Sequence, residues 1–388
     1  MENKEILIYG TGDIMTRPAD CDDVYAEPAK LFNAENAVVF GQLEATMGYT
    51  KMKVPQSRLP FSANPEMVNV LKRAGFDILS FGSNHSLDYG TQAFLETLDN
   101  LKKVGIMQVG SGVDEEDARS IRIIERDGVK IAFVGYCSIL PQDYWAEDDR
   151  PGCNPARGIT AYVPKEHDQP GTAVDIYTFP HPEDLQHMIE DIQKAKEMAD
   201  IVVASFHWGI HFKKAVIADY QKYYAHFAID AGADVVFGHH AHTLKPIEVY
   251  KGKVIFYSLG NFAMRRGEWA QNDILAAHKS LESFENSKRR KVIKAQWKEA
   301  VVPGRQEEYG WYCHTLAKCV VRDKKIVKVS YIPTYSDVDD VTKIGHPGND
   351  YFEHTLSIMD EITAMENLKT EYKYDPELNE VILVDDTK

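Results

Sequence analysis

Three histidines fall within five consecutive positions, in the segment Gly238-His239-His240-Ala241-His242. The mostly apolar run Ala233–Phe237 precedes them and is typical of a buried strand. Imidazole is a common metal ligand and a proton carrier near neutral pH. The segment is therefore a candidate metal site, provided that other parts of the chain bring carboxylates to the same place.

Four more apolar runs are each followed by residues that can bind a metal or move a proton. These runs alternate with helical patterns, which predicts a largely parallel sheet covered by helices. The carboxyl ends of parallel strands share one edge of a sheet, so we expect the polar residues to converge there. The pairs are Ile6–Tyr9 with Asp13, Ala37–Phe40 with Glu44, Ile78–Phe81 with Asn84 and His85, and Ile201–Phe206 with His207.

Each of these residues also has a simpler structural explanation. Asp13 could cap a turn, and Glu44 could be a solvated loop carboxylate. Asn84 and His85 could satisfy loop backbone groups, and His207 could be a buried, hydrogen-bonded histidine beside Trp208. The coincidence at five strand ends favours a shared site over five separate explanations.

The candidate ligands are oxygen and nitrogen donors without thiolate. The five cysteines are odd in number and lack CxxC spacing, so we expect reduced, mostly buried thiols. A set of Asp, Glu, Asn and His suits Mn, Zn or Fe as a divalent ion. One carboxylate shared between two ligand sets would build a two-metal centre, so one or two ions are expected.

Composition limits the partners of the chain. It has 388 residues, is 44% hydrophobic and carries a formal net charge of −15. This charge argues against nucleic acid or an anionic membrane as a general partner, because both require a basic face. We expect a small-molecule or peptide substrate, and Arg58 and Arg157 are candidate loop cations should it be anionic. With no signal peptide and no run of 18 apolar residues, a cytoplasmic location is expected.

The remaining pattern predicts how these elements are connected. We expect one domain over residues 1–335, with insertions at about 140–180 and 265–309, the latter helical over Ser280–Lys298. Residues 336–388 should form a helix and a polar tail packed on that domain. Helices are predicted at Pro65–Ala74, Thr91–Val104, Pro182–Met198, Ala218–Ala231 and Tyr351–Asn367; further strands at Ile131–Tyr136, Val235–Phe237 and Val254–Ser258; and hairpins at Ser120–Ile131 and Thr315–Ile332.

A series of motifs resembles the poly-gamma-glutamate capsule synthesis (CapA-like) family. The motifs are GDIM, QLEAT, FDILSFGSNHSLDYG, SFHWG, GADVVFGHHAHTLKPIEVY and VIFYSLGNF. The resemblance implies an α/β fold, the calcineurin-like metallophosphoesterase four-layer α/β sandwich with mixed central sheets. It implies Asp13, Glu44, Asn84, His207, His240 and His242 as metal ligands, with Glu44 bridging, and His85 as a contact to the substrate or leaving group. His239 has no counterpart in the broader phosphoesterase pattern and is expected behind the ligands.

The sequence departs from the family pattern at three places. Met15 replaces the histidine that usually follows the first aspartate, so one metal site loses a ligand. Gln42 replaces the asparagine before Leu43-Glu44, and His-Trp-Gly is followed by Ile210-His211 instead of an acid, which adds an imidazole. His211 is either a substitute ligand, a catalytic acid–base group or a surface residue. Asp88 could fix the tautomer of His85, or cap a helix, and Asn261 could face the site or stabilise a turn.

Three functions remain open on the sequence. The first is a metal-dependent hydrolase of a phosphoester or amide-type bond, linked to poly-gamma-glutamate or peptide metabolism, in which His85, Asp88 and His211 are catalytic. The second is an acid–base enzyme on the same centre, such as a peptide epimerase, as in the lasso-peptide epimerases that resemble this scheme. The third is a non-catalytic accessory protein of a polymer-synthesising complex.

Overall fold

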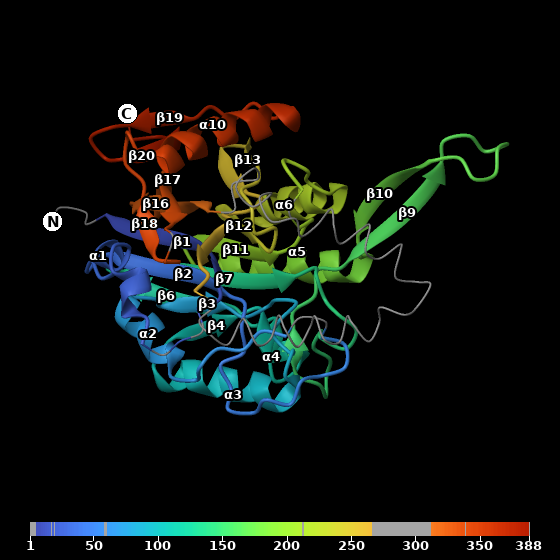
Figure 1. Ribbon diagram of the computed structural model, residues 1–388, viewed down its shortest axis with the longest axis horizontal. Coiled ribbons are helices and arrows are strands. Elements are labelled where there is room, and N and C mark those ends of the chain that lie inside the picture. Colours follow the sequence, from blue (N-terminus) through green and yellow to red (C-terminus); the bar gives the residue numbers. More distant parts are fainter. Residues whose placement is uncertain are drawn as a thin grey trace.

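The computed structural model describes residues 5–16, 18, 20–57, 60–211, 213–265, 312–337 and 339–387. Two β-sheets pack face to face and helices cover their outer faces (Figure 1). The predicted insertion at 265–309, the helical pattern Ser280–Lys298 and Arg58 lie almost wholly outside the described residues.

The larger sheet contains ten strands among the described residues. Its order is β19-β20-β17-β16-β1-β2-β3-β4, with β15 beside β1 and β18 beside β17. β1 to β4 run parallel, and β16, β17, β20 and β19 continue the sheet in antiparallel fashion. The bounds are β1 Ile6–Ile14, β2 Ala37–Leu43, β3 Ile78–Ser80, β4 Met107–Val109, β15 Asn261–Ala263, β16 Cys313–Arg322, β17 Lys325–Ser336, β18 Thr342–Ile344, β19 Lys373–Asp375 and β20 Glu380–Asp385.

The second sheet has the order β13-β14-β12-β11-β7-β6 within the described chain. Its four inner strands are parallel, and β6 and β13 are antiparallel edges. The bounds are β6 Arg122–Arg126, β7 Val129–Cys137, β11 Ile201–His207, β12 Val235–His239, β13 Ile247–Tyr250 and β14 Lys253–Phe256. Both sheets are thus mixed, as the sequence predicted. Two small sheets pair β5 (Ser111–Gly112) with β8 (Gly152–Cys153), and β9 (Gly158–Pro164) with β10 (Val174–Pro180).

The helices complete the layers. Their bounds are α1 Ala29–Phe32, α2 Met67–Ala74, α3 Gly90–Lys103, α4 Glu115–Ala118, α5 Pro182–Met198, α6 Asp219–Ala231 and α10 Asp350–Met365, with a 3-10 turn at Asp22–Tyr25. Each long helix lies within two residues of its predicted bounds. Pro182 begins α5 and Gly75, at a φ of 104°, ends α2, which are the usual positions of these two residues.

Three separate hydrophobic clusters fill the spaces between four layers. Leu71 and Phe94 belong to the cluster under α2 and α3, and Met188 and Tyr224 to the cluster under α5 and α6. Between the sheets, Phe40 stacks on Phe133 with ring centroids 5.9 Å apart. The expected four-layer α/β sandwich is confirmed.

The structure changes two expectations about the rest of the chain. The predicted polar tail contains β19 and β20, and β20 pairs with β17 in the larger sheet. Glu380 is buried there beside Lys318 and Lys328, and Val381 is buried in the core. The residues near 140–180 are also structured: Tyr144 and Ala156 are buried, and β9 and β10 form a hairpin arm.

Two simpler findings follow. All five cysteines are free and buried, as expected. Among the helices that the structure describes, none is long and apolar enough to span a membrane.

Candidate metal centre

The predicted ligands come together where both sheets end. Asp13 lies on β1, Glu44 directly after β2, and Asn84 in the loop after β3. His207 ends β11, and His240 and His242 follow β12 in the second sheet. The structure arranges them as two overlapping groups, Glu44 with His207 and His240, and Asp13 with Glu44 and His242. Glu44 belongs to both groups.

The first group surrounds the Asn84 amide oxygen. Asn84 Oδ1 lies 2.8 Å from His207 Nε2 and 3.1 Å from His240 Nδ1. His207 Nε2 is also 3.3 Å from Glu44 Oε1. The oxygen and nitrogen atoms that face one another here offer more lone pairs than N–H groups, which is the arrangement that a bound cation requires.

The second group surrounds the His242 ring. Its Nδ1 lies 3.5 Å from Asp13 Oδ2, and its Nε2 lies 3.6 Å from Glu44 Oε2. The backbone N–H of His240 donates to Asp13 Oδ2 at 3.1 Å, which holds this carboxylate in place.

The two carboxyl groups of the ligand set are buried without a positive charge of the described chain beside them to compensate a negative charge. Asp13 and Glu44 are fully buried, and desolvation raises the pKa of both carboxyls. Burial lowers the pKa of His207 and His240, so both rings stay neutral near pH 7 and keep a lone pair for a metal. Both oxygens of Glu44 lack a hydrogen-bond partner. An unpaired buried carboxylate is costly, so the donor set fits one or two divalent cations such as Mn, Zn or Fe.

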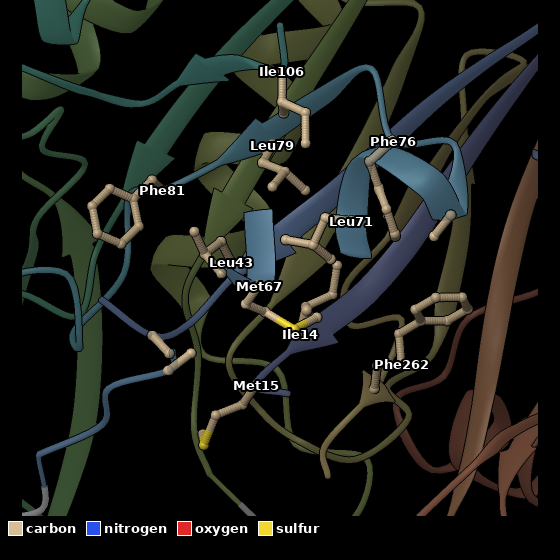
Figure 2. Packing of buried hydrophobic residues seen from close by; sticks show 14 of the residues in the cluster. Ile14, Met15, Leu43, Met67, Leu71, Phe76, Leu79, Phe81, Ile106 and Phe262 are labelled. Atoms are coloured by element: carbon tan, nitrogen blue, oxygen red, sulfur yellow. The ribbon is translucent and has the colours of Figure 1, made fainter. Parts of the chain in front are cut away.

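Met15 does not reach the centre. Its side chain is 2% exposed and joins the hydrophobic cluster under the larger sheet, as Figure 2 shows. Asn261 does reach the centre. β15 pairs with β1 so that Asn261 is opposite Asp13. Asn261 Oδ1 is 2.8 Å from His242 Nδ1. Accepting a hydrogen bond from Nδ1–H, Asn261 Oδ1 would fix the ring tautomer and turn the Nε2 lone pair towards Glu44. The sequence left this role open.

Glycine permits the close pairing of β15 with β1. A Cβ on Gly12 would lie 2.1 Å from the Gly260 carbonyl oxygen, and the Asp13 N–H donates to that oxygen at 3.0 Å. Any side chain at Gly12 would push Asn261 away from Asp13 and His242.

The histidine segment itself is strained. His240 and His242 have φ values of 86° and 56°, in the left-handed region that non-glycine residues seldom adopt. Each such residue costs about 1–3 kcal/mol and persists only where its surroundings enforce it, most often at functional sites. His239 lies behind them, as expected. Its Nε2 is 3.0 Å from the Thr11 carbonyl oxygen, so it joins β12 to β1 across the two sheets.

His85 is held by a network of donors around Asp88. His85 Nδ1 lies 2.7 Å from Asp88 Oδ2. Asp88 also accepts from Ser57 Oγ and from the Phe61 N–H, each at 2.7 Å, and from Tyr144 at 3.3 Å. The contact with Asp88 fixes the proton of His85 on Nδ1 and leaves Nε2 for a substrate. The helix-cap alternative for Asp88 is not what the structure shows, because its carboxylate is occupied by these contacts.

His211 covers the ligand group. Its ring centroid is 3.7 Å from that of His240 and 5.3 Å from that of His242. Burial lowers the pKa of His211 to about 4, so the ring is neutral near pH 7. His211 is thus half-buried against the ligand rings.

The model of one family, described as bacterial capsule synthesis protein PGA_cap, matches residues 5–266. The chain belongs to this family. PGA biosynthesis protein CapA of Bacillus subtilis is 34% identical over 66% of this chain and 62% of its own length. Capsule biosynthesis protein CapA of Bacillus anthracis is 30% identical over 58% of this chain and 48% of its own. The chain thus spans about half to three-fifths of these relatives.

Solved structures resemble this PGA_cap family member only distantly. A phosphatase from Mycoplasma pneumoniae aligns over 90% of this chain and 99% of its own, with 14% identity and a TM-score of 0.41. The NAD nucleotidase of Haemophilus influenzae aligns over 94% and 67%, with 12% identity and a TM-score of 0.39. Likenesses at this level carry no argument about the reaction.

Two cations of this PGA_cap family member differ from expectation. Arg157 pairs with the buried Asp184 at 2.6 Å and its guanidinium lies over the Trp145 ring, so this cation is already neutralised. Lys245, three residues after His242, was not singled out in the sequence. It is 1% exposed, and burial lowers its pKa to about 8. A lysine in the otherwise apolar stretch from Leu244 to Ile247 was the signal that could have identified it.

Proposed function

We propose that the protein is a metal-dependent hydrolase acting on a phosphoester or an amide-type bond. The observation that carries this proposal is the pair of ligand groups that share Glu44. Divalent ions bound in such a pair would lower the pKa of a water molecule and neutralise the negative charge that develops on the reacting oxygens.

The residues of the chain itself have three tasks in this reaction. Asp13, Glu44 and the histidines supply buried neutral or anionic donors that hold the cations. His85 directs Nε2 to the leaving group, and when Nε2 also carries a proton the ring can give that proton to the leaving atom while Asp88 holds the Nδ1–H. His211 lies over the ligand rings and keeps bulk water from them.

The family supports a more specific substrate. Two relatives are named for poly-gamma-glutamate or capsule biosynthesis, which favours an amide-type bond in a glutamate polymer or peptide. The chain spans only part of the length of those relatives, so the substrate remains part of this proposal.

Metal content is the first test. The full chain, purified without chelator or affinity metal, should contain transition metal, and the double variant His240→Ala/His242→Ala should lose it. Two ions per chain would support a binuclear centre, and one would show that the loss at Met15 leaves a single site. No metal in the wild-type protein would contradict the proposal and favour the non-catalytic accessory function.

Hydrolysis is the second test. A chromogenic phosphodiester and a gamma-glutamyl anilide should be cleaved by the metal-loaded protein. His85→Ala should slow cleavage by roughly 10²–10⁴-fold with metal content unchanged, the usual contribution of one general acid. The control His354→Ala changes an exposed histidine on α10 and should have full activity.

One observation favours a second candidate, proton exchange at a peptide α-carbon. His211 and His85 both lie close enough to His240 to shift its pKa, so two imidazoles flank one centre. Deuterium uptake at a peptide α-carbon without bond cleavage, lost in His85→Ala or His211→Ala, would replace hydrolysis by epimerisation.

A further inference from the structure

His211 reaches the ligand rings from the loop that joins β11 to α6, which we call the His211 loop (residues 208–211 and 213–218). No helix or strand forms among these described residues. The ring nevertheless lies against His240, with the two centroids 3.7 Å apart. Its place over the centre therefore depends on contacts that other elements make to the loop.

Helix α6 holds the two ends of the His211 loop. The Gly209 N–H donates to the Tyr220 hydroxyl at 2.7 Å, and the Ala218 N–H donates to the Gln221 amide oxygen at 2.9 Å. Both partners lie in the first turn of α6. These bonds leave the middle of the loop, which carries His211, to be held by other residues.

Lys245 holds the middle of the loop and comes from the segment after β12. Its Nζ donates to the carbonyl oxygen of Lys213, two residues after His211. Lys245 is 1% exposed, and among the described residues this carbonyl is the hydrogen-bond partner of its ammonium. Burial lowers the pKa of His211 and the ammonium adds to that shift, so the two side chains lie near each other. Lys245 thus ties the loop after β11 to the loop after β12.

Helix α10 holds the second half of the His211 loop through two carboxylates. Glu361 pairs with Lys214 at 2.6 Å, and Glu366 Oε1 accepts from the Ile217 N–H at 3.4 Å. The other oxygen of Glu366 pairs with Lys222 of α6 at 2.9 Å. Glu366 therefore joins α10, α6 and the His211 loop.

The segment after α10 holds the backbone beside Lys245. The Thr370 hydroxyl donates to the Ile247 carbonyl oxygen at 2.6 Å, and the Ile247 N–H donates to the Tyr372 hydroxyl at 3.4 Å. Ile247 is two residues after Lys245, so the C-terminal segment supports both loops that Lys245 connects. All of these C-terminal residues lie after residue 266, where the match to the family model ends.

We infer that Lys245 and Glu366 are positioning residues of the candidate metal centre, which hold His211 over the ligand histidines. Taking an ammonium out of water is costly, and an apolar side chain of similar length would fill the same space without that cost. What the lysine adds at this place is the bond to the Lys213 carbonyl. The effect on catalysis rests on the proposed function, whereas the placement of His211 rests on the contacts alone.

Hydrogen exchange of the full chain tests the placement without an assay of activity. Lys245→Met keeps the length of the side chain and removes the ammonium, and Glu366→Ala removes both carboxylate contacts. Amides in residues 208–218 should exchange at least about tenfold faster in each variant, because each loses a hydrogen bond to a charged group. Metal content should equal that of the wild type.

A double-mutant cycle tests whether Lys245 acts through His211. On a substrate that the metal-loaded protein converts, Lys245→Met should slow turnover by about 10–100-fold, the usual effect of losing a residue that orients a group at a metal site. In a His211→Ala background the same change should have almost no further effect, because the group that it positions is absent. A lysine that only stabilised the fold would slow both backgrounds equally.

Two further variants serve as controls. Glu353→Ala changes a carboxylate at the opposite end of α10 that accepts from the Gly348 N–H, and should leave exchange and turnover unchanged. Glu366→Gln keeps an oxygen for the Ile217 N–H and should restore part of the protection that Glu366→Ala loses. The Glu366 variants carry the exchange test by themselves should Lys245→Met fail to fold.

Two results would overturn the inference. One is unchanged exchange of residues 208–218 in both Lys245→Met and Glu366→Ala. The other is an equal loss of turnover from Lys245→Met with and without His211. A protein that converts no substrate would contradict the proposed hydrolase alone, because the exchange measurement still decides whether these residues hold the loop.

Discussion

Glu44 is the residue on which the geometry and the electrostatics of the centre both depend. It belongs to both ligand groups, is fully buried, and neither of its oxygens has a hydrogen-bond partner. A carboxyl that stabilised only the fold would be paired. Its oxygens face His207 Nε2 at 3.3 Å and His242 Nε2 at 3.6 Å, so its neighbours are other candidate metal ligands.

Glu44→Gln should therefore have opposite effects on metal content and on metal-free stability. Metal per chain should fall by at least one ion. The raised pKa of Glu44 means that its contribution to stability is present below the ordinary value of 4.5 and is lost as pH rises through the folded pKa. Glutamine never ionises, so the metal-free variant should unfold with a free energy equal to or above that of metal-free wild type at pH 8.

Urea unfolding of chelator-treated protein and elemental analysis measure the two effects. Glu96→Gln is the control, since Glu96 bonds the loop at Tyr49 and Thr50 and lies in neither ligand group. Unchanged metal content in Glu44→Gln, or a metal-free variant less stable by several kcal/mol, would show that Glu44 is a structural residue.

His314 gives a pH dependence that is separate from the metal ligands. It is 1% exposed, and burial lowers its pKa to about 3. A histidine with a depressed pKa stabilises the fold above 6.5, and this stability is lost as pH falls from 6.5 towards 3. The loss is about 1.4 kcal/mol per pH unit.

The variant His314→Gln should lack this slope. Free energies of unfolding between pH 7 and 4.5 should fall more steeply for the wild type than for the variant. Parallel curves would mean that His314 is protonated in the folded state or that the site opens at low pH.

At the scale of elements, the sequence predicted the site residues that lie at the ends of strands. Asp13, Glu44, Asn84 and His207 each follow or end an apolar run, and the carboxyl ends of both sheets bring them together. Long amphipathic helices such as α5 were predicted for the same reason, because their periodicity extends over many residues.

Short strands that depend on distant partners were not predicted. β15 has three residues and is a strand only because β1 lies beside it, which is why the role of Asn261 stayed open. β20 reads as Glu-Val-Ile-Leu-Val-Asp within a polar tail, and β17 makes it a strand. Tertiary context overrides local pattern in such segments.

Gly12→Ala tests the coupling between β15 and the centre. The new Cβ would meet the Gly260 carbonyl, so β15 must move and carry Asn261 from His242. We expect metal affinity to fall by roughly 10–100-fold, the usual effect of losing a residue that orients a ligand. Competition with a chelating dye measures the affinity.

The control is Gly171→Ala, where the backbone φ is 86° and nothing lies within 4 Å. It should cost about 1–2 kcal/mol of stability with unchanged metal affinity. Full metal affinity in Gly12→Ala would contradict a role for the β1–β15 pairing.

At the scale of the molecule, the last strands complete the larger sheet. Removing residues 370–388 would expose the edge of β17 and leave Lys318 and Lys328 without Glu380. Breaking a buried ion pair costs about 3–5 kcal/mol, so the shortened protein should unfold at a lower temperature or aggregate. Differential scanning calorimetry and solubility measure this outcome. Removal of residues 386–388 alone keeps both strands and should have little effect.

The pairing of β1 with β16 determines how this protein must be made. β1 can pair with β2 soon after both are synthesised. Its other edge pairs with residues 313–322, which are synthesised much later. During synthesis the ribosome therefore releases β1 to β4 with one edge of β1 unpaired by β16 until residues 313–322 emerge. Contacts this distant fold slowly and favour aggregation of the unfinished chain. Slower translation of the first half should therefore lower the soluble yield, and a chaperone that covers an open sheet edge should restore it.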